Sequence, residues 1–498
     1  MSAASSPAHL ARPAGSPSAR RILLGRSAGP LVLALLAAAA LLYVATLTLS
    51  SLYIDEVFSW QAAYGSLHQL FHAVRVDEVA PPTYYLGLHV WALDLLHSDS
   101  PLALRLPSAA AGVGLVGSLI WFTWRLQGPR AALLAGVLGV LSPLLLRYGQ
   151  EARSYIWAML AVTLAAASAL ELEHRAHRRT RWVGMLALAA VLAVWLNYTA
   201  WPLVVAIVAW ASVRAVRGRE RAVLILAVGA AALALVPLAS DQLSRGHWVG
   251  IAPGAGLTVN NLTRVLATPF DGRFDTGHPV AVVAVIGGAV LLLAASIWAW
   301  RRRVAHVGLL LVLTWLGPIL ALAQTLVSHD VLITRYTAMS APFGLALLAV
   351  ALCAIGSPRA RLAGVAGALT VGALGMAASL APSGHYPDLD GVFARVAAGW
   401  RAGDVIVLSG YTTLGAGPNY YLPRHPQTVA APVYNLSTSP ELRGVVAART
   451  HRLWLVLDDP GADHFVAALP TVRYDARRQW RLPGNPAQRV VLAAPQRF

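Results

Sequence analysis

Residues 29–60 read "GPLVLALLAAAALLYVATLTLSSLYIDEVFSW", an apolar run that ends at two adjacent acids, Asp55 and Glu56. The run holds about 20 residues, which is enough for a helix to cross the hydrocarbon core of a bilayer. The pattern therefore predicts a membrane-spanning helix with two carboxylates just beyond its far end.

The whole chain has the same apolar character. Of its 498 residues, 57% are hydrophobic and 12% are charged, and the mean hydropathy is +0.59. This balance is typical of a multi-spanning membrane protein. The net charge of +17 would suggest nucleic acid as a partner of a soluble protein, but membrane chains carry cations in their cytoplasmic loops. We therefore expect membrane lipids and no nucleic acid around this chain.

Eleven apolar stretches predict an α-helical polytopic domain over residues 30–381. We expect residues 1–29, which are basic and rich in Ala, Ser and Pro, to form a cytoplasmic tail before an uncleaved first helix, rather than a cleaved signal peptide. The stretches lie near residues 30–50, 103–124, 130–146, 154–170, 182–197, 199–213, 222–239, 279–300, 306–327, 336–355 and 361–381.

Charge divides unequally between the two sets of loops. If the N-terminus is inside, the tail and the loops on its side hold 19 arginines and three acids, and the opposite loops hold eight arginines and eleven acids. Cytoplasmic loops are the arginine-rich ones. The count predicts a cytoplasmic N-terminus and a first outer loop at residues 51–102. Because eleven is odd, it also places residues 382–498 outside.

Residues 382–498 alternate between helix and strand patterns, which predicts a small extracytoplasmic α/β domain. The chain has no Walker-type or dinucleotide-binding glycine motif, so we expect no nucleotide cofactor. Helices are expected at 387–400, 442–450 and 461–470, and strands at 404–410, 451–461 and 488–495.

The predicted outer loops contain acidic and arginine residues that could take part in catalysis or bind a ligand. The acid pair at 55–56 follows the first span directly, and Asp77 and Glu78 form a second pair in the same loop. Either pair could instead keep the loop outside, cap a helix or lie in a solvated turn. However, a carboxylate at membrane depth becomes a functional candidate when other polar groups converge on it.

Two further outer segments carry arginines. "LRYGQEARSYIW", residues 146–157, holds Arg147, Glu151 and Arg153, and "ITRY", residues 333–336, holds Arg335. Such arginines often snorkel to the interface or form surface ion pairs. A guanidinium at this depth also suits a phosphate, because its planar fork of donors matches the phosphate oxygens.

Six motifs, in this order, resemble the bacterial GT-C glycosyltransferases of the protein O-mannosyltransferase-like type (family 39). These enzymes depend on polyprenyl-phosphate sugars and have the lipid A aminoarabinose transferases as distant relatives. The resemblance covers roughly residues 30–380. The motifs are "YIDEVFSW", "APPTYYLGLHVW", "SPLALRLPSAAAG", "SPLLLRYGQEARSYIWAML", "LNYTAW" and "ITRY".

The resemblance implies an inverting transfer with Asp55 as general base. A carboxylate takes the proton of the acceptor hydroxyl, and nearby cations stabilise the departing phosphate. Arg153 is our first choice for binding that phosphate and Arg335 the second, with Tyr155 from the matching "EARSY" segment.

The remaining acids have open roles. Glu56 could bind the acceptor or, with Asp55, a divalent cation, although two adjacent carboxylates are weak support for a metal; we leave the metal unassigned. Asp77, Glu78 and Glu151 are left as acceptor-binding or structural residues.

We therefore predict a plasma-membrane glycosyltransferase. Its partners would be a polyprenyl-phosphate sugar, with mannose favoured, and a glycan, lipid or protein acceptor. One alternative is a lipid or polysaccharide transporter, which would instead place ionisable residues in the middle of its helices. Another is a non-catalytic scaffold that binds cell-wall glycan.

Overall fold

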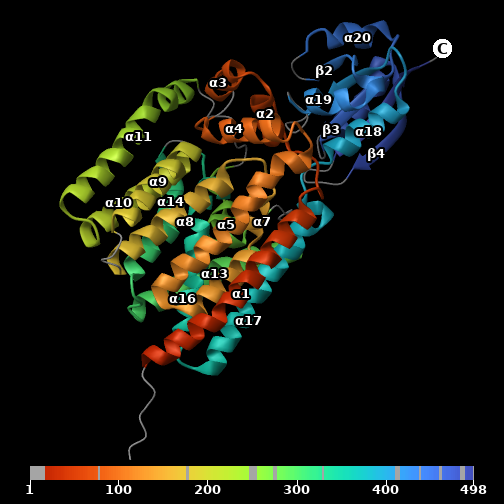
Figure 1. The fold of residues 1–498 in the computed structure, drawn as a ribbon. Coiled ribbons are helices and arrows are strands. Elements are labelled where there is room, and N and C mark those ends of the chain that lie inside the picture. Colours follow the sequence, from red (N-terminus) through yellow and green to blue (C-terminus); the bar gives the residue numbers. More distant parts are fainter. Residues whose placement is uncertain are drawn as a thin grey trace, which may run out of the picture.

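A computed structural model describes residues 17–76, 79–174, 179–245, 255–272, 278–327, 330–409, 416–436, 439–458, 462–482 and 488–496. Within these ranges, nine helices are long and apolar enough to span a membrane, and they pack as one bundle (Figure 1). They are α1 (Pro17–Thr46), α5 (Pro101–Gln127), α8 (Tyr155–His174), α9 (Arg179–Leu196), α11 (Gly218–Ser244), α13 (Pro279–Arg301), α14 (Val307–Val327), α15 and α16 together (Thr334–Thr337 and Ala341–Cys353), and α17 (Pro358–Leu380).

The predicted span at 130–146 is a bent pair of helices rather than one straight helix. Helix α6 (Pro129–Val140) and helix α7 (Pro143–Gly149) meet at 61°. Pro143 lacks a backbone N–H and disfavours helical geometry in the residue before it, so the helix breaks there. Ser142 restarts it, because its Oγ accepts from the backbone N–H of Leu145 at 3.4 Å. The bend brings Arg147 to the end of the bundle.

The predicted span at 199–213 is α10 (Trp201–Arg214), whose 14 residues make it shorter than a usual membrane helix. At 1.5 Å per residue it extends about 21 Å, against a hydrocarbon core of about 30 Å. The eleven predicted stretches are thus all helical, but nine of them form full-length spans within the described residues.

Two spans form the centre of the bundle. The apolar windows of α8 and of the α15–α16 span are 78% and 89% buried, whereas those of α1 and α11 are 11% and 17% buried. Alanine is frequent in the two central spans, and such small residues let membrane helices approach closely. Arg335 and Tyr155 both lie in the first turns of these central spans, so their backbones are held by the best-packed part of the molecule.

Four short helices cover one end of the bundle (Figure 1). They follow α1, and the last of them is a π-helix. Their bounds are α2 (Ile54–Tyr64), α3 (Leu67–Val76), α4 (Thr83–Leu88) and η1 (His89–Leu95). A further short helix, α12 (Val259–Leu266), precedes α13.

The C-terminal part contains a five-stranded mixed sheet in the order β2-β1-β3-β5-β4. Strands β2, β1 and β3 are parallel, and β5 and β4 are antiparallel additions at one edge. The bounds are α18 (Leu389–Gly399), β1 (Val405–Leu408), α19 (Ala416–Tyr421), β2 (Val433–Asn435), α20 (Leu442–Ala448), β3 (Leu453–Asp458), α21 (Ala462–Ala468), β4 (Tyr474–Leu482) and β5 (Gln488–Pro495).

All six C-terminal elements predicted from the sequence are present, which confirms the α/β character. Strands β2 and β4 and helix α19 were not predicted. Most of β4 is exposed, and its segment "YDARRQWRL" lacks the alternation of apolar and polar residues that marks a half-buried strand.

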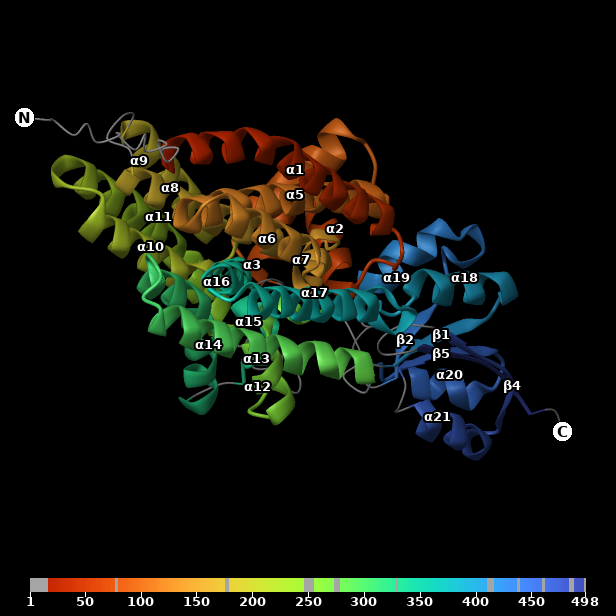
Figure 2. The same ribbon diagram turned by 90° about the horizontal axis from the view of Figure 1, so that it is seen from below.

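The sheet lies at the same end of the bundle as α2, with α19 between them (Figures 1 and 2). The Tyr420 ring packs edge-on against Trp60, with ring centroids 5.0 Å apart. The Tyr421 hydroxyl donates to the Leu52 carbonyl at 3.1 Å. Burial raises the pKa of Tyr421, so this hydroxyl stays protonated. The sheet is therefore fixed directly against the segment that leads into Asp55.

Candidate functional site

A buried ion pair fixes the start of α2. The Glu56 side chain is 0% exposed and that of Arg105, on α5, is 1% exposed. Arg105 Nε donates to Glu56 Oε1 and Nη2 donates to Oε2, each at 2.7 Å. The Glu56 carboxylate also accepts from the backbone N–H groups of Tyr53 and Ala152, at 3.0 and 2.9 Å. Its two oxygens thus accept four hydrogen bonds, all from the protein itself.

Arg105 is equally saturated. Its three remaining N–H groups donate to the carbonyls of Leu47, Ser50 and Ser51 at 2.7–2.8 Å. These carbonyls follow α1, where no helical partner is left for them. One guanidinium therefore ties together the exit of α1, the start of α2 and helix α5, in the paired and fully hydrogen-bonded form that a buried charge needs.

Asp55 points elsewhere. It precedes Glu56 in the first turn of α2, and neighbouring helical residues project about 100° apart. Asp55 Oδ2 lies 3.8 Å from Arg335 Nη1, and the two side chains are 19% and 22% exposed. The two adjacent acids thus face different partners and do not form a joint carboxylate pair.

The guanidinium of Arg335 keeps its hydrogen-bond donors available for a ligand. A guanidinium carries five donors, yet among the described residues that of Arg335 makes no hydrogen bond within 3.5 Å, and its ion-pair partner is Asp55. A charged donor group in this half-buried position is strongly disposed to bind an anion.

Arg335, which lies 3.8 Å from Asp55, also lines a cavity of about 190 Å³. Arg147 and Arg264 reach the same cavity, so three guanidinium groups converge on it. The other lining residues are Asn261, Leu332, Ile333 and Thr334. Its electrostatic character therefore favours a compact anion.

The other two arginines of the cavity are held by buried acids. Arg264 Nε lies 2.9 Å from Asp271 Oδ1, and the Asp271 side chain is fully buried. Thr334 Oγ1 donates to Asp271 Oδ2 at 2.6 Å. Asp271 therefore links α12 to the residue that precedes Arg335.

Arg147 is held by Glu151 and Tyr386. Its Nε donates to Glu151 Oε1 at 3.0 Å and its Nη2 donates to the Tyr386 hydroxyl at 3.1 Å. That hydroxyl donates in turn to Glu151 at 2.6 Å. The Tyr386 ring stacks on Tyr53 at a centroid distance of 3.8 Å, so the network reaches the segment just before Asp55.

Arg153 and Tyr155, both predicted to bind phosphate, are not among the residues that line this cavity. Arg153 Nη1 donates to the Asp55 carbonyl at 3.2 Å, to Ser59 Oγ at 3.3 Å and to the Tyr85 hydroxyl at 3.1 Å. The Tyr155 ring packs against Tyr148 with centroids 4.7 Å apart. Arg153 thus braces α2 against α4.

Two predicted acids cannot be placed. Asp77 and Glu78 lie outside the described residues. Among the residues that the structure describes, no three His, Cys, Asp or Glu side chains gather as metal ligands would. Asp55 and Glu56 hold no ion jointly in this arrangement, because Glu56 already accepts four hydrogen bonds.

Sequence reasoning missed Arg264, Asp271, Arg105 and Tyr386 as parts of this site. Arg105 stood within a quoted motif, "SPLALRLPSAAAG", as an arginine inside an apolar span, and that alone marks a residue that needs a partner. Arg264 lies on the short helix α12, Asp271 and Tyr386 come from segments without a periodic pattern, and the proximity of all three arises from tertiary packing.

Comparisons with known proteins identify the fold. No protein-family model matches the chain, and no curated protein matches its sequence. Three similar solved structures are ArnT from Cupriavidus metallidurans bound to undecaprenyl phosphate, the Archaeoglobus fulgidus oligosaccharyltransferase in complex with Zn and sulfate, and the oligosaccharyltransferase AglB from Archaeoglobus fulgidus with an inhibitory peptide and a dolichol-phosphate.

The similarity extends over most of the chain. For ArnT the TM-score is 0.54 at 15% identity, covering 96% of this chain and 98% of ArnT. For the oligosaccharyltransferase in complex with Zn and sulfate the TM-score is 0.52 at 14% identity, covering 90% of this chain and 71% of that protein. For AglB the TM-score is 0.50 at 12% identity, covering 89% of this chain and 70% of AglB. The chain therefore has the GT-C membrane fold that its motifs predicted, with a C-terminal sheet attached.

We predict that Glu56→Ala destabilises the protein, because it leaves Arg105 buried without a counter-ion. Breaking a buried pair from one side costs about 3–5 kcal/mol. The measurement heats the purified protein in detergent and uses size-exclusion chromatography to quantify the protein that remains folded at each temperature.

Asp55→Asn is the matched control. It should change stability less than Glu56→Ala does, since the Asp55 side chain is 19% exposed and lies 3.8 Å from Arg335, and loose ion pairs contribute little. Equal stability of the Glu56→Ala and Asp55→Asn variants would contradict the positioning role of Glu56.

Proposed function

We propose that this protein is a membrane glycosyltransferase that moves a sugar from a polyprenyl-phosphate donor to an acceptor hydroxyl with inversion of configuration. The observation that carries the proposal is the pairing of the Asp55 carboxylate with Arg335 at the edge of an arginine-lined cavity. A base and an anion-binding group next to each other are what such a transfer needs.

The solved structures of the same fold support the donor class. ArnT was solved with undecaprenyl phosphate and AglB with dolichol-phosphate, and both ligands are polyprenyl phosphates. We infer that the phosphate of a similar donor occupies the cavity of Arg147, Arg264 and Arg335. The sequence resemblance favours mannose as the sugar.

In this mechanism Asp55 removes the proton from the acceptor hydroxyl while the oxygen attacks the anomeric carbon. The bond from that carbon to the phosphate oxygen breaks, and the phosphate leaves with an added negative charge. Arg335, with its unused donors, stabilises that charge. Arg147 and Arg264 act beside it from positions fixed by Glu151 and Asp271.

Arg335 also links donor binding to the base. In this structure its Nη1 lies 3.8 Å from Asp55, so a phosphate in the cavity competes with Asp55 for the same guanidinium. We infer that donor binding draws Arg335 toward the cavity and releases the Asp55 carboxylate from this contact. Glu56 and Arg153 serve as positioning residues, because both hold the turn that carries Asp55.

The location of the site follows from loop charge. We propose that the protein is a multi-pass protein of the plasma membrane with a cytoplasmic N-terminus, and that Asp55 and residues 382–498 are extracytoplasmic. The distribution of arginines among the loops supports this orientation.

We predict that Asp55→Asn lowers sugar transfer by about 10²–10⁴-fold, the usual contribution of a general base. The assay incubates membranes with labelled polyprenyl-phosphate sugars and quantifies the labelled product. Asp94→Asn, an exposed acid in the same loop, is the control and should transfer normally. An unchanged product profile for Asp55→Asn would refute the assignment.

We predict that Arg335→Gln lowers kcat by about 10²–10³-fold, as expected when a donor to a developing charge is removed. Arg335→Lys should recover part of the rate, because it keeps the charge and loses the planar fork. Arg75→Gln, at a 60% exposed arginine of the same end, is the control. Loss of activity in Arg153→Gln together with normal kcat in Arg335→Gln would instead favour Arg153 as the phosphate ligand.

We predict the orientation to be visible by labelling of introduced thiols in a Cys353→Ala background. A membrane-impermeant maleimide applied to intact cells should label the Asp94→Cys variant. It should label Arg359→Cys only after lysis, because that exposed position lies at the start of α17 in an arginine-rich segment that we propose to be cytoplasmic. The reverse pattern would contradict the proposed topology.

A further inference from the structure

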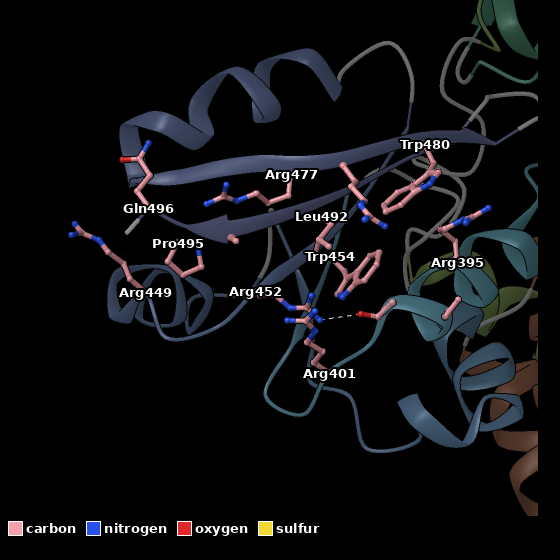
Figure 3. Close-up of a pocket in the computed structure, with 14 residues that line it drawn as sticks. Arg395, Arg401, Arg449, Arg452, Trp454, Arg477, Trp480, Leu492, Pro495 and Gln496 are labelled. Carbon is pink, nitrogen blue, oxygen red and sulfur yellow. Dashed lines mark hydrogen bonds between the residues drawn. The ribbon is translucent and has the colours of Figure 1, made fainter. Parts of the chain in front are cut away.

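A second cationic region lies on the C-terminal sheet, apart from the cavity beside Asp55. It is a groove of about 940 Å³ between α18, the loop before β1 and strands β4 and β5 (Figure 3). Six of its fourteen lining residues are arginines: Arg395, Arg401, Arg449, Arg452, Arg477 and Arg478. Figure 3 shows the arginines that it labels spread along the length of the groove, with Trp480 and Arg395 at one end and Arg449 at the other.

Strand register builds the floor of this groove. Trp454 of β3 pairs with Leu492 of β5, which pairs with Arg478 of β4. Paired residues point to the same face of a sheet, so these three side chains form one row. Trp480 lies in the next row, opposite Val490. Helix α18 packs on this face against β5, and its Arg395 lies over the Trp480 ring of β4.

An irregularity in β4 adds one more arginine. Ala476 pairs with Ala493 and Arg478 pairs with Leu492, so Arg477 is an extra residue between two consecutive pairs. In a regular strand, Arg477 and Arg478 would point to opposite faces. A bulge re-aims side chains, and here both neighbouring arginines line the same groove.

Charge in this part of the chain is strongly segregated. Residues 382–498 contain twelve arginines and eight acids; the groove takes six of the arginines, and no acid is among its described lining residues. Arg452 is neutralised by Asp404, and Arg477 lies 3.7 Å from Asp475. Within the described part of the chain, the guanidinium groups of Arg395, Arg401, Arg449 and Arg478 have no carboxylate partner.

The ligand must therefore carry several negative charges along an extended shape. Arginine forks bind carboxylates and phosphates in bidentate fashion. The Arg395 guanidinium lies over the Trp480 ring, 5.4 Å from its centroid. A planar cation and an aromatic ring are therefore in contact at one end of the groove. Leu492 is the one long aliphatic side chain among the described lining residues, which gives an acyl chain little to pack against.

We propose that this groove is a non-catalytic binding site for an anionic polysaccharide, one that carries carboxylate or phosphate groups on successive sugars. The site is separate from Asp55 and does not depend on the proposed transferase activity. It would hold the protein on acidic glycan of the cell envelope.

The test measures binding by the full-length protein in nanodiscs of zwitterionic lipid. The probes are fluorescent oligogalacturonate, whose sugars each carry a carboxylate, and neutral dextran of similar length. We expect oligogalacturonate to bind, with affinity that falls as salt rises because the contacts are ionic, and we expect no binding of dextran. Arg395→Gln with Arg478→Gln should weaken binding at least tenfold.

Two variants serve as controls. Arg443→Gln, at an exposed arginine of α20 that is not among the groove's lining residues, and Asp55→Asn should bind as the unmodified protein does. If the double variant does not fold, Arg449→Gln with Arg477→Gln tests the same groove. Binding that survives both double variants, equal binding of dextran, or binding confined to vesicles of anionic lipid would overturn the proposal.

Discussion

The buried pair of Glu56 and Arg105 is the interaction on which the geometry of the site depends. Two charges without access to water are stable only if every polar atom is satisfied, and here all five donors of Arg105 and both oxygens of Glu56 are engaged. The network joins the end of α1, the start of α2, helix α5 and the segment at Ala152. It sets the direction in which Asp55 leaves the first turn of α2.

The pattern of buried acids holding arginines recurs around the site. Asp271 holds Arg264, and Glu151 holds Arg147 together with Tyr386. All of these residues lie far from Asp55 in the sequence. Arg335 differs, since its partner is at 3.8 Å and its donors are otherwise unused. Arg147 and Arg264, which these partners hold in place, thus line the same cavity as Arg335, whose guanidinium can move to bind a ligand.

Sequence predicted the helical membrane fold and most C-terminal elements well, because apolar length and periodicity report burial directly. It predicted Asp55 and Arg335 as candidates through motif order and loop side. The choice of Asp55 over Glu56 as the base came from the family resemblance, since adjacent acids look alike until a partner such as Arg105 is placed 49 positions away. Sequence reasoning ranked Arg153 above Arg335, whereas the hydrogen bonds of Arg153 to Ser59 and Tyr85 lead us to propose Arg335 as the phosphate ligand.

The most direct measurement is a cryo-EM structure of the protein with a polyprenyl phosphate bound. We predict that the phosphate lies within hydrogen-bond distance of Arg335 in the cavity with Arg147 and Arg264, and that Arg335 has moved away from Asp55. A phosphate bound at Arg153 alone, or outside this cavity with the contact between Arg335 and Asp55 unchanged, would contradict the proposed site.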